Sequence, residues 1–180
     1  MLGSAILVQA AEQGGGVGAS LARLFEPWSH VYASSKIVAT LVTFGHVASL
    51  LLAGGLAVAT DRATLRALRL AAAERGRHLE ELAGAHRMVV GGIALSLVTG
   101  LLLFAADVES FYASWVFWVK MLMIAVLLAN GYVMTEAERV LRADAAEGSP
   151  AWGRLRRAAL VSMMLWYSIT LAGVALVNAS

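Results

Sequence analysis

A single histidine stands near the middle of a long apolar stretch. His46 lies within residues 37–59, which contain no other ionisable side chain. A polar group at that depth of a bilayer is costly unless it has a partner, so His46 is a candidate functional residue. Histidine is the usual axial ligand of b-type haem, and small neighbours such as Gly45 and Ala53 leave room for a flat macrocycle. Alternatively, His46 hydrogen-bonds a Ser or Thr of a neighbouring helix.

Two further basic side chains are candidates for the same site. Lys120 lies inside another apolar stretch and either reaches toward His46, as a base or ligand, or returns its ammonium to the membrane surface. His86 is a candidate second ligand or an interfacial residue, and its predicted depth differs from that of His46 by roughly 20 Å. We predict His46, His86 and Lys120 as cofactor-binding residues, His46 and His86 as metal ligands, and Lys120 as catalytic.

The sequence lacks the residues and motifs that several other kinds of site require. The sequence has no cysteine, which excludes disulfides, Cys-ligated zinc and iron–sulfur clusters. It has no phosphate-binding glycine loop, no HExxH and no haem-attaching CxxCH. Asp and Glu are absent from the cores of the apolar stretches, which argues against a carboxylate proton relay. The net charge is only +2, and the basic residues are concentrated in two connections, so nucleic acid is not expected as a partner.

The elements that must position these residues are membrane-spanning helices. Hydrophobic residues make up 59% of the chain and charged residues 14%, whereas a soluble domain is about a quarter charged. Four apolar stretches are each long enough to cross a hydrocarbon core of about 30 Å. We predict an all-α membrane protein with a four-helix transmembrane bundle over residues 36–180 and spans at residues 37–59, 88–106, 115–134 and 158–177.

The charges of the connections predict an orientation. The second connection holds no Lys or Arg, whereas the first and third are rich in arginine. Positive connections stay in the cytoplasm, so both basic connections are expected inside and both termini outside. The residues concerned are Arg62, Arg66, Arg69, Arg75, Arg77 and Arg87 in the first connection, and Arg139, Arg142, Arg154, Arg156 and Arg157 in the third.

Two segments outside the spans are expected to lie on the membrane surface. Residues 1–35 are predicted as an interfacial N-terminal extension with one short helix, residues 21–26, ended by Pro27. Residues 63–86 have an amphipathic pattern that suits a helix along the lipid headgroups. Within the second span, Gly92, Ser96 and Gly100 recur every four residues, a stripe that lets another helix approach closely.

Two stretches resemble a known group of proteins. FGHVASLLLAGGLAVATDRATLRA, residues 44–67, is similar to the first span of small bacterial membrane proteins of the HemJ-type protoporphyrinogen oxidase and CopD-like group. VFWVKMLMIAVLLAN, residues 116–130, resembles their third span. In the HemJ-type proteins the first-span histidine and the third-span lysine are the functional pair, and the proteins bind haem. The resemblance therefore implies that His46 and Lys120 act together.

The leading hypothesis is an integral protein of a bacterial-type inner membrane that binds haem b for electron transfer or porphyrin redox chemistry. An enzyme of this kind would be an oxidoreductase. One alternative is a non-enzymatic membrane subunit or scaffold in which His46 makes a structural hydrogen bond. A second is a small transporter for a metal or a porphyrin. The expected partners are the lipid bilayer and either a redox partner, another membrane protein or a second copy of the chain.

Overall fold

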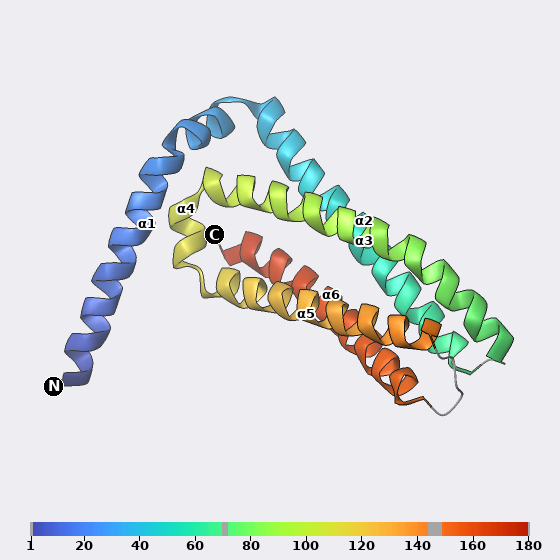
Figure 1. Cartoon of the computed structure of the whole chain (residues 1–180). Coiled ribbons are helices and arrows are strands. Elements are labelled where there is room, and N and C mark those ends of the chain that lie inside the picture. Colours follow the sequence, from blue (N-terminus) through green and yellow to red (C-terminus); the bar gives the residue numbers. More distant parts are fainter. Residues whose placement is uncertain (1, 70–71, 144–148, 180) are drawn as a thin grey trace.

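The structure, a computed structural model, describes residues 2–69, 72–143 and 149–179, which are helical apart from the short links between helices (Figure 1). No strand occurs in these ranges. The helices are α1 (Leu2–Ser34), α2 (Lys36–Ala67), α3 (Ala72–Ala106), α4 (Val108–Ala113), α5 (Trp115–Ala143) and α6 (Pro150–Ala179).

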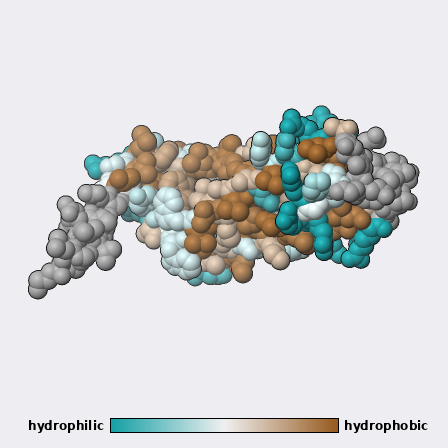
Figure 2. Space-filling model, turned by 60° about the horizontal axis from the view of Figure 1, so that its bottom comes forward, coloured by the Kyte–Doolittle hydropathy of each residue, from teal (hydrophilic) through white to brown (hydrophobic). Residues whose placement is uncertain are grey.

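Four of the described helices are long and apolar enough to cross a membrane. They are α2, the Gly84–Ala106 part of α3, α5, and the Pro150–Leu176 part of α6. Hydrophobic side chains cover the middle of the bundle, and hydrophilic ones gather in a band toward one end (Figure 2). The predicted fold class, an all-α membrane protein with a four-helix bundle, is confirmed, and the chain is a multi-pass membrane protein.

The bundle consists of two helical hairpins. Helix α2 packs along α3, α5 packs along α6, and the hairpins meet mainly where α2 lies against α6. The ends of α2 and α5 and the starts of α3 and α6 lie together at one end of the bundle (Figure 1). We call this the arginine-rich end, because both basic connections are there, and the opposite end, where α4 joins α3 to α5, the α4 end.

Small residues bring α2 and α3 into close contact. A Cβ added to Gly92 would lie 2.8 Å from the Cβ of Ala53, and one added to Gly100 would lie 3.1 Å from Cε1 of His46. Both distances are shorter than ordinary van der Waals contact, so a side chain at Gly92 would force a shift and one at Gly100 would press on the His46 ring. The predicted close-approach stripe of Gly92, Ser96 and Gly100 is confirmed, and α2 is the helix that it admits.

The N-terminal segment differs from the prediction of one short helix. Helix α1 runs from Leu2 to Ser34 and passes through Pro27 without ending there. Proline removes one backbone hydrogen bond, and contacts beyond it hold the helix in place. The indole N–H of Trp28 donates to the Leu102 carbonyl at 2.8 Å, and the Ser29 hydroxyl donates to the Ala106 carbonyl at 2.9 Å. Both bonds attach α1 to the last turn of α3, and the Ala106 carbonyl is one of the terminal carbonyls that have no partner within that helix.

The predicted amphipathic helix at residues 63–86 is also absent as a separate element. Its residues form the end of α2 and the beginning of α3, joined through a turn. At this end of the bundle α3, α5 and α6 share a hydrophobic cluster that includes Leu79, Leu82, Leu141 and Leu155. The apolar face thus packs against other helices, and the helices extend beyond the predicted spans.

Candidate functional site

His46 lies against α3. Its Nδ1 is 3.1 Å from the carbonyl oxygen of Ser96 and 3.1 Å from Oγ1 of Thr99. Gly100 lets the ring lie close to α3, because a Cβ at that position would be only 3.1 Å from Cε1 of His46. Three positions of one turn of α3 therefore fix the imidazole.

One tautomer of His46 satisfies both contacts, the one with its hydrogen on Nδ1. A carbonyl oxygen only accepts hydrogen bonds, so Nδ1 must carry the hydrogen that Ser96 receives. The Thr99 hydroxyl donates its own hydrogen to the Leu95 carbonyl at 2.8 Å, so its oxygen is free to accept from Nδ1 as well. The neutral imidazole then has its lone pair on Nε2. A histidine ligand is typically held in this way, with one ring nitrogen on a carbonyl and the other on the metal.

Lys120 lies in the same half of the bundle as His46. Its side chain is half-buried and extends from α5 toward α6, where Nζ lies 3.6 Å from the position of a Cβ at Gly173. The positive charge of Lys120 acts on His46 at a distance and disfavours a second positive charge on the imidazole. The two residues implied by the family resemblance therefore lie in the same half of the bundle, with His46 directed to α3 and Lys120 to α6, and we call them the His46–Lys120 region.

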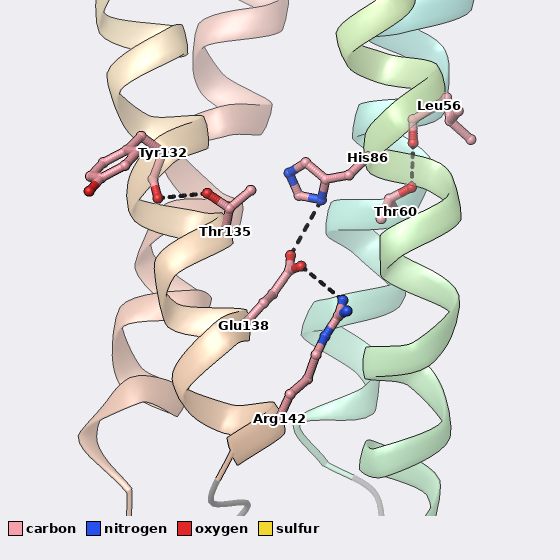
Figure 3. Close-up of polar contacts among 7 residues, drawn as sticks. All are labelled: Leu56, Thr60, His86, Tyr132, Thr135, Glu138 and Arg142. Carbon is pink, nitrogen blue, oxygen red and sulfur yellow. Dashed lines mark hydrogen bonds and ion pairs between the residues drawn. The ribbon is translucent and has the colours of Figure 1, made fainter.

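His86 is placed elsewhere. Its Nδ1 is 3.5 Å from Oε1 of Glu138, and Oε2 of Glu138 is 3.5 Å from Nη2 of Arg142 (Figure 3). Ser96, which binds His46, comes ten residues after His86 on α3, a rise of about 15 Å. The structure therefore does not bring His46 and His86 together as a ligand pair.

Two buried carboxylates were missed by the sequence analysis. Asp61 is 2% exposed and Glu138 is 4% exposed, and both lie in membrane-spanning helices. Both lie just outside the predicted spans, because α2 and α5 continue beyond those spans and stay packed against other helices there. One sequence signal was available, since Asp61 follows Ala53 and Ala57 at intervals of four and so shares their helix face.

A cavity lies between the helices beside Asp61. It holds about 60 Å³ of space and is lined by Asp61, His86, Asn130 and Ser162, among other residues. The Ser162 hydroxyl donates to the Asp61 carboxyl, and Asn130 Nδ2 on α5 donates to the Ala158 carbonyl on α6 at 2.9 Å. We call this space, together with Glu138, the carboxylate cavity.

Comparison with known proteins adds no assignment to either region. No protein-family model, curated protein or solved structure matches the chain. Across the part of the chain that the structure describes, no group of three or more His, Asp or Glu side chains is disposed to hold a metal ion.

Proposed function

We propose that the chain binds haem b in the membrane for electron transfer or porphyrin redox chemistry, with His46 as the axial ligand. The observation that carries this proposal is the orientation of His46, whose Nδ1–H is held by the Ser96 carbonyl and the Thr99 hydroxyl. The neutral ring therefore presents its Nε2 lone pair, which is the form that ligates iron. In this respect the residues present fit the group.

Lys120 has two uses in this proposal. Its ammonium, half-buried near His46, can bind a propionate carboxylate of the haem or serve as the second ligand or base. Bound haem supplies one-electron redox chemistry. The apolar helices around the site exclude water, and Ser96 and Thr99 keep the imidazole from rotating.

The proposal includes an orientation and a membrane. Arginine-rich connections are retained in the cytoplasm, so the carboxylate cavity is at the cytoplasmic end and the His46–Lys120 region is in the outer half. Both termini are then outside, and the membrane is of the bacterial inner type. An electron donor or acceptor, a second copy of the chain or another membrane protein would approach the lipid-facing helices.

A second candidate function is that of a non-enzymatic membrane subunit. The observation that favours it is the pair of bonds from His46 to α3, because they give the imidazole a structural role within the bundle. Such a protein would use its helix faces to bind another membrane protein. The two candidates differ in whether Nε2 of His46 has a ligand.

A visible absorption spectrum of the full chain, purified in mild detergent after expression with added haem, tests the proposal. We expect a Soret band and reduced α and β bands that are lost in His46→Ala and retained in His30→Ala, which changes an exposed histidine of α1. His86→Ala is also expected to retain them, because His86 lies in the other region. A wild-type protein without a Soret band would reject haem and favour the membrane-subunit function.

A further inference from the structure

The carboxylate cavity contains polar atoms that the proposed function does not use. Oδ2 of Asp61 has no hydrogen-bond partner among the described residues, although the side chain is only 2% exposed. Oε1 of Glu138, 4% exposed, likewise receives no hydrogen bond within the described ranges and is approached by His86 only as an ion-pair partner. Leaving a buried carboxylate oxygen without a hydrogen bond is unfavourable, so each of these oxygens calls for a proton, a cation or a hydrogen-bonding water molecule.

The cavity beside Asp61 is suited to hold water. A space of about 60 Å³ is well above the roughly 10–15 Å³ that a cavity needs to hold a water molecule. Its lining supplies polar partners, since the amide oxygen of Asn130 stays free to accept when Nδ2 donates to Ala158. Water in this space would reach Asp61, Ser162 and His86, which all line it.

The groups that face the two carboxyls come from all four spanning helices. Asp61, on α2, is faced by Ser162 from α6 and by the charge of Glu138 from α5. Glu138 is faced by His86 from α3 and by Arg142 one turn later on α5 (Figure 3). No set of three metal-ligating side chains is found among the residues described, and this favours a proton over a multivalent metal ion as the bound species.

We propose that Asp61, His86 and Glu138 form a proton-exchange site at the arginine-rich end of the bundle. A protonated Glu138 gives its proton from Oε1 to Nδ1 of neutral His86, and Nε2 of His86 gives its proton to cavity water. That water passes a proton to Oδ2 of Asp61. One proton has then moved, Asp61 is neutral, and the carboxylate of Glu138 is balanced by Arg142. This site is independent of haem binding.

Infrared difference spectroscopy of the full chain in lipid, taken as the pH is changed, tests this site. We expect a C=O band of a buried protonated carboxyl that shifts when ²H₂O is perfused, because the proton exchanges with cavity water. Asp61→Asn should remove one component of the band and Glu138→Gln another. The matched controls Asp107→Asn and Glu136→Gln change more exposed carboxyls and should leave these components in place.

Ser162→Ala provides a second variant in case Asp61→Asn does not fold. It removes the hydrogen bond to Asp61 and should shift the Asp61 component to higher frequency without abolishing it. His46→Ala should leave the bands unchanged, so the outcome is separate from that of the haem test. A band that is absent, that is unaffected by ²H₂O, or that survives intact in Asp61→Asn and in Ser162→Ala would overturn the proposal.

Discussion

The two polar regions of the bundle differ in how far their side chains are hydrogen-bonded by the neighbouring helices. In the His46–Lys120 region, the Nδ1–H of the neutral imidazole finds its acceptors on α3. They are the Ser96 carbonyl and the Thr99 hydroxyl. In the carboxylate cavity, Asp61 and Glu138 are more deeply buried and each keeps one oxygen without a hydrogen-bond donor. The fold thus satisfies Nδ1 of His46, whereas it leaves one oxygen of each buried carboxyl without a donor among the described residues.

This difference separates structural from chemical roles. A polar side chain that is hydrogen-bonded by neighbouring helices raises the free energy of unfolding, whereas a buried polar group without partners lowers it. A group of the second kind is a candidate for a chemical role. His46 has features of both kinds, because its Nδ1 is hydrogen-bonded to α3 and its Nε2 has no such bond to α3. The variants below test whether stability changes with opposite sign in the two regions.

The largest change in the free energy of unfolding is expected at the contact between Gly92 and Ala53, which holds α3 against α2. Gly92→Leu should lower the free energy of unfolding by about 3 kcal/mol, because a side chain there collides with Ala53 and forces α2 from α3. The measurement is unfolding in detergent followed by circular dichroism. Gly91→Leu is the control, since a Cβ at Gly91 meets nothing within 4 Å. Equal effects of the two variants would contradict the close packing of α2 on α3.

In the carboxylate cavity a substitution should stabilise the protein. Asp61→Asn keeps an oxygen for the Ser162 hydroxyl but removes the need for a proton, so we expect the free energy of unfolding to rise by about 2 kcal/mol. The same unfolding measurement applies. Asp107→Asn should change nothing, because Asp107 is exposed and Asn caps α4 as well as Asp does. A loss of stability in Asp61→Asn would mean that the carboxylate has a structural partner.

In the His46–Lys120 region a substitution should destabilise. His46→Ala removes both bonds to α3 and should lower the free energy of unfolding by about 1 kcal/mol, the scale of interhelical hydrogen bonds in membranes. Thr99→Val removes one acceptor and should lower it by roughly half as much. Stabilisation by His46→Ala would place this region in the same class as the carboxylate cavity.

The smallest effect is expected at the rim of the carboxylate cavity. Arg142→Ala removes a partly exposed ion pair with Glu138 and should lower the free energy of unfolding by roughly 0.5 kcal/mol. Arg139→Ala, which breaks an exposed pair with Glu136 three residues earlier in the same helix, should have no measurable effect. If Arg142→Ala, like Arg139→Ala, leaves the free energy of unfolding unchanged, Arg142 does not balance the charge of Glu138.

The sequence was sufficient for the spans because hydropathy is a property of contiguous residues. Four apolar stretches, the arginine-rich connections and the small-residue stripe of α3 could all be read from residue types and intervals. The N-terminal helix could not, since Pro27 is a stop signal in isolation and only the bonds of Trp28 and Ser29 to α3 carry the helix past it.

The rotation of each helix was decided only by tertiary structure. In a membrane, lipid and protein interior are similarly apolar, so the hydrophobic pattern hardly distinguishes the face that packs from the face that meets lipid. The sequence identified His46 as unusual, but packing on α3 decided which of its nitrogens is free. Packing at the arginine-rich end likewise enclosed Asp61 and Glu138, which hydropathy had assigned to the connections, because burial there depends on contacts between residues far apart in the chain.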